Sequence, residues 1–312
     1  MMVPPSRSPL ARTLDAIGTR RLIFLLLAIL VTGALLLPAS EEGLTITDTT
    51  EGLYDTIEDL KPGDPILISF DYDPPSKPEL YPASRAVLRH AFRKRLRVVA
   101  LGLWPAGKGL AQEAIDLEAN FARDTQPDVS RDDAYPLYGQ DYVYLGFLPG
   151  EDAVIVRLTE GVQGTSATDY RGEAVDGMEV WTGRDGREIK TLADFKLVVT
   201  ISAGFPGIDE WIRKGRGKER FALAAAVTAV TAPGKMPFYT SGQIVGLLNG
   251  MRGAAEYESL VNDLEDESRY GIPPLHEALS GMNALSSAHF LVIALVVVSN
   301  VLYFRSRRRG RP

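Results

Sequence analysis

Two loops carry residue types that suit ligand binding. Asp71 and Asp73 follow a short apolar run, and Ser202, Gly204 and Gly207 lie in a turn between a strand-like run and a helix-like segment. Neighbouring carboxylates can hold a cation or accept hydrogen bonds from hydroxyl groups. A glycine-containing turn before a helix can present backbone N–H groups to an anion. Each loop also has a structural interpretation: an aspartate that caps the next helix, or a glycine that permits a tight turn.

Two further loops add candidates of the same kind. Lys108 lies in the segment Trp104–Gly109, where its charge would stand near the start of a helix, and Thr231 opens the segment Thr231–Lys235. Lys108 is equally explained as a solvated side chain, and Thr231–Lys235 as a plain strand-to-helix connection. None of these loops matches a dinucleotide or P-loop fingerprint. The candidate ligand-binding residues are therefore Asp71, Asp73, Lys108, Ser202, Gly204, Gly207 and Thr231.

The sequence gives little support to catalysis. It contains no cysteine, which excludes disulfides, thiolate metal sites and cysteine nucleophiles. It has no GxSxG elbow, and His90, His276 and His289 are not spaced as metal ligands. We therefore expect no metal site and no cofactor. A pair of carboxylates acting as acid and base stays open, because the chain is rich in acidic residues.

Wholly apolar runs alternate with helix-like segments through the middle of the chain. Runs that are apolar on both faces, each followed by a helix, indicate a parallel sheet covered on both sides. We predict an α/β fold, a three-layer α/β/α sandwich with a mostly parallel sheet of about five strands. Ligands bind at the carboxyl ends of such strands, which selects the loops above. The predicted strands are Pro65–Phe70, Arg97–Trp104, Asp141–Leu148, Phe195–Ser202 and Phe221–Val230.

The segment Thr240–Glu267 reads as one long helix with two different faces. Thr240 and Gln243 have the spacing of a capping box, and bulky apolar residues gather on one side. Four glycines gather opposite, where they would allow close contact with this protein's own sheet, with a second copy or with another membrane protein. These glycines are Gly242, Gly246, Gly250 and Gly253.

Two apolar segments predict membrane attachment at both ends of the body. Residues 22–39 and 288–304 read as transmembrane helices, next to basic tips at 1–21 and 305–312. By the positive-inside rule both tips face the cytoplasm, and the domain 40–287 lies on the other side of the membrane. A cleaved signal peptide is the alternative for the first segment, and a buried helix for the second.

Charge and irregular segments refine this view. The tips hold nine arginines and one aspartate, which leaves 25 basic and 39 acidic residues between them, a net charge of −14. An acidic body argues against nucleic-acid binding. The segment Asp124–Tyr138 reads as a long loop, and Gln163–Thr191 as an excursion with a small hairpin at residues 184–187.

The strand–turn–helix rhythm is similar in general form to periplasmic binding-protein lobes and flavodoxin-like domains, a likeness of fold that carries no function. The first hypothesis is a membrane-anchored extracytoplasmic module that binds a ligand or partner protein. Its partners would be the lipid bilayer and another membrane protein or a second copy, with no nucleic acid. The alternative is a membrane-anchored hydrolase or transferase with Asp71 or Asp73 as base and Ser202–Gly207 holding an anion. A component of a secretion or envelope complex is a third possibility.

Overall fold

The chain forms two compact units in a computed structural model. One unit spans residues 41–279, close to the predicted domain 40–287, and the other comprises residues 1–40 with 280–312. The structure describes residues 19–36, 43–126, 130, 134–183, 186–215, 221–263 and 274–309. Residues 184 and 185 of the predicted hairpin, and part of the predicted loop 124–138, lie outside these residues.

The body is built on one parallel sheet of six strands in the order β3-β2-β1-β4-β5-β6. Every residue of β1, β2 and β4 is buried, which is why these strands are mostly apolar on both faces. The α/β fold and its parallel sheet are confirmed, with six strands instead of about five. The strands are β1 (Pro65–Asp71), β2 (Arg97–Gly102), β3 (Tyr142–Phe147), β4 (Leu197–Ser202), β5 (Ala222–Val227) and β6 (Gly246–Asn249).

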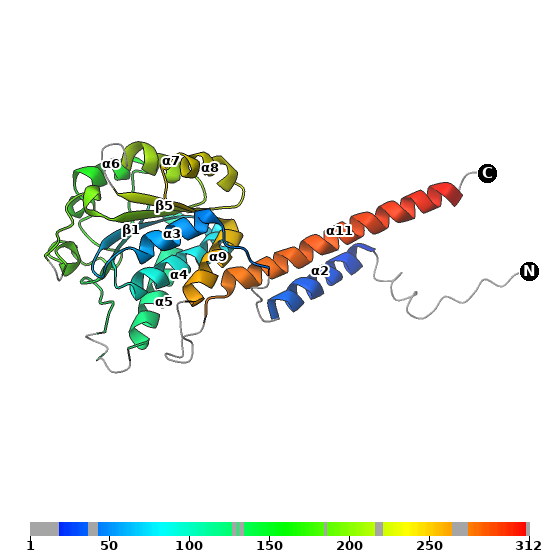
Figure 1. Cartoon of the computed structure of the whole chain (residues 1–312), viewed down its shortest axis with the longest axis horizontal. Helices are drawn as coiled ribbons and strands as arrows, with labels where there is room; N and C mark the ends of the chain where they lie inside the picture. Colours follow the sequence, from blue (N-terminus) through cyan, green and yellow to red (C-terminus); the bar gives the residue numbers. More distant parts are fainter. Residues whose placement is uncertain are drawn as a thin grey trace, which may run out of the picture. The chain divides into compact units, whose positions relative to one another are not determined.

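Helices cover both faces of the sheet (Figure 1). On one face lie α3 (Asp48–Glu58), α4 (Lys77–Arg93), α5 (Lys108–Asp124) and α9 (Gly250–Asp263). On the other lie α6 (Ala153–Glu160), α7 (Ile208–Glu210) with the π-helical turn Trp211–Gly215, and α8 (Ala232–Thr240). Short 3-10 turns occupy Pro74–Ser76, Pro105–Gly107, Gln163–Thr165, Glu179–Trp181 and Leu192–Asp194.

The core on the α6 and α7 side joins the sheet to the segment between α6 and β4. Trp181 and Trp211 are both almost fully buried and pack in one cluster with Leu67 and Val198 of the sheet. The predicted excursion Gln163–Thr191 therefore contributes to this core instead of standing apart from it. Its tryptophan fills the space that the short helices leave open.

The prediction of one helix over Thr240–Glu267 is wrong. Thr240 ends α8 instead of capping a new helix, a turn follows, and Gly246–Asn249 forms β6 before α9 begins at Gly250. Leu247 and Leu248 pair with Ala225 and Ala226 of β5, so a short apolar run that also fits helical spacing completes the sheet. Burial beside β5 stabilises the strand because both leucines are within 1 % of complete burial.

The four glycines do not form one helical face. Gly242 and Gly250 have φ of +71° and +53°, and these left-handed residues break the helix on either side of β6. A Cβ at Gly246 would lie 2.5 Å from the backbone N of Leu53, so this glycine lets α3 rest directly on β6. A Cβ at Gly253 would lie 2.8 Å from the Leu248 backbone. All four glycines serve close packing or chain reversal within the body.

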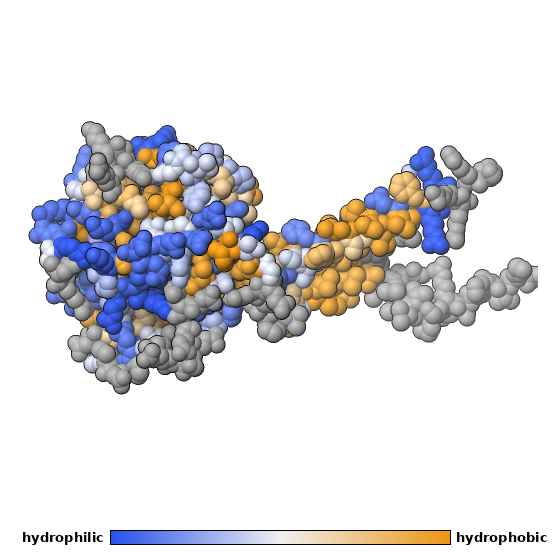
Figure 2. Space-filling model, viewed as in Figure 1, coloured by the Kyte–Doolittle hydropathy of each residue, from blue (hydrophilic) through white to orange (hydrophobic). Residues whose placement is uncertain are grey.

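The second unit contains two helices, α2 (Thr19–Leu36) and the part of α11 (Glu277–Arg309) beyond residue 279. Within the described residues one helical stretch, Glu277–Arg305, is long and apolar enough to cross a membrane, and an 18-residue segment of it has a mean hydropathy of 2.1. Figure 2 shows its apolar surface between more polar ends. The predicted first span, 22–39, forms α2 over residues 22–36, and 37–39 lie outside the described residues.

Candidate functional site

The strand order places a topological switch point between β1 and β4. The chain adds β2 and β3 on one side of β1, then returns to place β4, β5 and β6 on the other side. In open α/β sheets of this order, ligands bind at the carboxyl ends of the strands beside the switch point. Asp71 and Ser202 are the last residues of β1 and β4 and are register partners there. The two principal candidate loops are therefore adjacent.

A polar column crosses the sheet at the switch point. Residues two apart in a strand share a face, and register partners in neighbouring strands lie side by side. Ser69 pairs with Thr200, and Asp71 with Ser202, on the face that carries Val198. All four polar residues are at most 3 % exposed. Such a column inside an apolar core costs free energy unless its groups find hydrogen-bond partners.

The carboxylate of Asp71 forms its hydrogen bonds with other groups of the protein. It accepts from the Ser69 hydroxyl and from the Leu103 backbone N–H, both at 2.6 Å. Burial raises the pKa of Asp71 to about 7, against the lowering effect of these two hydrogen bonds. The side chain ties β1 to the segment that follows β2. It is fully buried and is not a lining residue of the pocket beside Ser202.

A pocket of about 230 Å³ opens beside Ser202 at the carboxyl edge. Its walls come from the end of β4 and its loop, from α7, from the end of β5 and from the start of α8. The volume lies below the ~300 Å³ at which pockets for drug-sized ligands begin. The lining residues are Ser202, Gly204, Phe205, Ile208, Asp209, Glu210, Val227, Thr231 and Lys235.

The charged groups of this pocket are paired with one another or with the backbone. Lys235 Nζ lies 2.6 Å from Asp209 Oδ2. Glu210 accepts from the Gly207 backbone N–H at 2.9 Å and also pairs with Arg213. The Glu210 contact holds the glycine loop against the start of α7. The formal charges of the lining residues and Arg213 cancel.

The hydroxyl group of Ser202 has no protein partner among the described residues, although the residue is 3 % exposed. The hydroxyl lines the pocket, so it is open to hydrogen bonding from a molecule inside it. A Cβ at Gly207 would lie 2.7 Å from Ser202 Oγ and 2.3 Å from the Gly204 carbonyl oxygen. Glycine at this position therefore lets the loop close over the strand end beside the hydroxyl.

The structure brings some of the predicted site residues together and separates others. Ser202, Gly204 and Thr231 line the pocket, with Gly207 beside them. Asp73 instead accepts from Ser76 N and Oγ, at 3.2 and 2.8 Å, and caps the turn before α4. Asp73 thus acts as a cap, which is the structural interpretation given above for its loop.

Lys108 also lies outside the pocket. It begins α5, its side chain is not a lining residue, and its carbonyl oxygen accepts from Tyr144 Oη at 3.2 Å. Sequence reasoning missed Asp209 and Glu210, which face the pocket from α7. Their position directly after the glycine loop was a usable signal. The contact between Asp209 and Lys235 joins two elements and has no local signature in the sequence.

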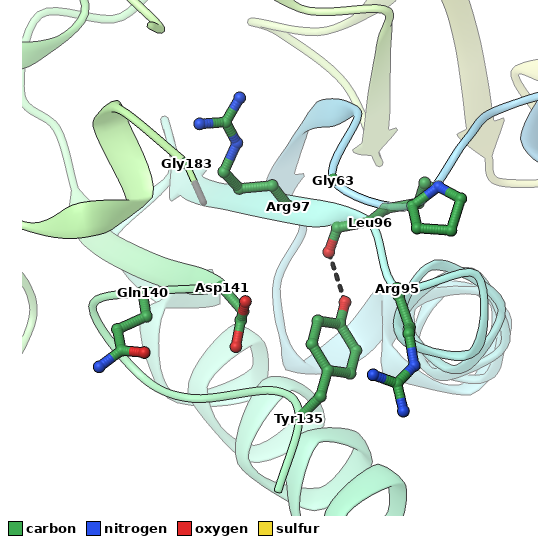
Figure 3. A pocket seen from close by; sticks show the side chains of 9 residues that line it. Gly63, Arg95, Leu96, Arg97, Tyr135, Gln140, Asp141 and Gly183 are labelled. Atoms are coloured by element: carbon green, nitrogen blue, oxygen red, sulfur yellow. Dashed lines mark hydrogen bonds between the residues drawn. The ribbon is translucent and has the colours of Figure 1, made fainter. Parts of the chain in front are cut away.

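A second cavity, of about 290 Å³, lies at the amino-terminal edge of the sheet (Figure 3). Tyr135 Oη donates to the Leu96 carbonyl oxygen, and Asp141 accepts from the Leu137 backbone N–H at 2.9 Å. Figure 3 shows the side chains of Arg95 and Arg97 pointing in different directions, so their charges do not converge on one ligand position. This cavity is a weaker candidate than the one beside Ser202.

Metal binding has no geometric support among the residues that the structure describes, where no three acidic or histidine side chains form a cluster that could hold an ion. His90 is buried and bridges Glu58 and Tyr257 through its two ring nitrogens, each at 2.8 Å. Burial lowers the pKa of His90 to about 4, so the ring is neutral at pH 7. The ring links α3, α4 and α9, and none of these helices contributes a residue to the lining of the pocket beside Ser202.

No protein-family model and no curated protein matches the chain. Among solved structures it is similar to an α,α-trehalose-phosphate synthase (UDP-forming) from Burkholderia vietnamiensis, with a TM-score of 0.33 and 11 % identity over 90 % of this chain and 51 % of that one. A trehalose-6-phosphate synthase follows, with a TM-score of 0.30 and 11 % identity over 84 % and 45 %. The chain thus spans about half the length of these structures. Likeness at this level carries no argument about ligand or activity.

Proposed function

We propose that this protein is a membrane-anchored α/β module that binds a small ligand in the pocket beside Ser202 without transforming it. The observation that carries the proposal is the Ser202 hydroxyl, which lines a cavity and makes no hydrogen bond to the protein among the described residues. A bound ligand would supply the missing hydrogen bond, and the position at the switch point is where such folds place ligands.

Attachment to the membrane is part of the proposal. The stretch Glu277–Arg305 supports one span, and the arginines that follow it support a cytoplasmic C-terminus. With residues 22–39 as a second span, the body would lie outside the cytoplasm and both tips inside. Another membrane protein or a second copy then remains a candidate partner for the spans.

Binding fits the pocket better than catalysis does. In the described part of the chain, no hydrogen bond connects Ser202 Oγ to a histidine, lysine or carboxylate that would activate it. A hydrolase or transferase needs a nucleophile with a base in reach. Asp71 has the raised pKa that a base needs, but it is fully buried and already accepts two hydrogen bonds.

Native mass spectrometry of the full chain, extracted from its membrane in detergent, tests the proposal. We expect a small-molecule adduct on the wild-type protein and a lower occupancy on Ser202→Ala. The matched control is Thr200→Val, which alters a buried hydroxyl on the same strand outside the pocket lining. Equal occupancy of all three proteins would contradict the proposal. Turnover of a compound by wild-type protein, abolished in Asp71→Asn or Ser202→Ala, would favour the enzyme instead.

A further inference from the structure

The polar groups of the Ser202 pocket form a mixed set of donors and acceptors. Lys235 Nζ gives one hydrogen bond to Asp209 Oδ2 and keeps further donors. Thr231 donates to the Thr228 carbonyl oxygen at 3.0 Å and accepts from the Thr228 hydroxyl at 3.1 Å, which leaves one acceptor position on its oxygen. Ser202 has both roles open within the described residues. The second oxygen of Asp209 adds another acceptor.

We infer that the ligand of this pocket is a neutral polyhydroxylated molecule of the size of one sugar ring. This inference rests on the proposed function of the same pocket. Each hydroxyl group of such a ligand is both a donor and an acceptor, which matches lysine donors beside carboxylate and threonine acceptors. The small volume, about 230 Å³, suits a single ring.

Charged ligands fit the pocket less well. An anion would meet the Asp209 carboxylate and the Thr231 acceptor, and a cation would meet Lys235. A zwitterion would have to separate Asp209 from Lys235, which are 2.6 Å apart and only partly exposed. Breaking a partly buried ion pair leaves each charge to be satisfied again. A neutral ligand leaves that pair in place.

The apolar part of the lining suits the C–H faces of a ring. Ile208 and Val227 are almost fully buried in the pocket wall, while Phe205 is 56 % exposed at the same pocket. Ligand pockets combine apolar and aromatic walls with a few placed polar groups. An exposed aromatic ring at the pocket is a surface on which a sugar ring can lie.

Isothermal titration of the full chain in nanodiscs, at low and high salt, tests the inference with three probe sets: neutral hexoses and hexitols, zwitterionic amino acids, and inorganic phosphate. We expect binding by a member of the first set, with an affinity that salt leaves unchanged. Phe205→Ala should weaken it about 2- to 10-fold, the range for loss of an aromatic contact. The control Val230→Ala alters an 88 % exposed neighbour outside the lining and should bind like wild type.

The possible results distinguish an error in the inferred ligand class from an error in the proposed binding site. Binding by an amino acid or by phosphate that depends on Ser202, and on salt for phosphate, overturns the inference and leaves the proposed function standing. Failure of every hexose and hexitol to bind also overturns it. Adducts that appear equally on wild type and Ser202→Ala by native mass spectrometry overturn both.

Discussion

Thr200 provides a sharp test of the polar column in the core. Its side chain is fully buried in β4, and its hydroxyl has no hydrogen-bond partner in the part of the chain that the structure describes. Burying a hydroxyl without a partner costs about 1–3 kcal/mol in mutational data. Valine has nearly the same shape, with a methyl group in place of the hydroxyl. Thr200→Val should therefore raise the free energy of unfolding by about 1–2 kcal/mol, a gain that few buried polar-to-apolar changes give.

Thr50→Val is the matched control, because the substitution and the burial are the same. Thr50 is also fully buried, but its hydroxyl donates to Glu256 Oε2 at 2.8 Å. Removing this hydrogen bond to a buried carboxylate should lower the free energy of unfolding by about 1–2 kcal/mol. The hydroxyl of Thr50 has a buried partner and that of Thr200 has none among the described residues, so the two effects should have opposite signs.

Thermal unfolding of the full chain in detergent, followed by circular dichroism, measures both variants. For a body of this size, 1 kcal/mol corresponds to about 2–4 °C in Tm. We expect Thr200→Val to melt above wild type and Thr50→Val below it. If Thr200→Val melts as far below wild type as Thr50→Val, the hydroxyl has a partner in solution and the account of the polar column is refuted.

Three further predictions concern the loop, a buried carboxylate and topology. Gly207→Ala should lower the free energy of unfolding in urea by about 1–3 kcal/mol, because its Cβ would lie 2.3 Å from the Gly204 carbonyl oxygen. The control Gly204→Ala should change little, because its Cβ would lie 3.4 Å from the Trp104 ring. Burial raises the pKa of Glu258 to about 7, above its unfolded value. Its contribution to the free energy of unfolding is therefore full below about pH 4.5 and is lost as pH rises toward 7. Glu258→Gln should flatten the measured pH dependence of stability in that window, and an unchanged slope would contradict this. Reporters fused after Pro312 and inserted near Asp128 should report opposite sides of the membrane, and both on one side would refute the two-span proposal.

Runs such as β1 and β4 were predictable because burial on both faces of a parallel sheet leaves a wholly apolar run in the sequence. The turn at Ser202 and Gly204 was predictable for the same reason, since the carboxyl ends of such strands are where ligands bind. Thr231 was predicted as a candidate ligand-binding residue and lines the pocket, whereas Lys235, from the same segment, was not among the candidates although it lines the pocket too.

The sixth strand was not predictable from local pattern. Gly246–Asn249 is only four residues long, and its two leucines fit helical spacing as well as a strand. What decides between the two is pairing with β5 and the close approach of α3 through Gly246, both of which are tertiary contacts. The charged pair in the pocket also depends on tertiary contacts. Asp209 and Lys235 meet only because α7 and α8 cover the same strand ends.

The role of the Ser202 hydroxyl tests the central claim most directly. Because this hydroxyl lines the pocket and makes no hydrogen bond to the protein within the described residues, Ser202→Ala should leave the free energy of unfolding within about 0.5 kcal/mol of wild type. It should weaken binding of the pocket ligand about 2- to 10-fold, the value of one hydrogen bond. Titration and urea unfolding of the same preparation give both quantities. Unchanged affinity, or a loss of stability that accounts for weaker binding, would contradict the claim.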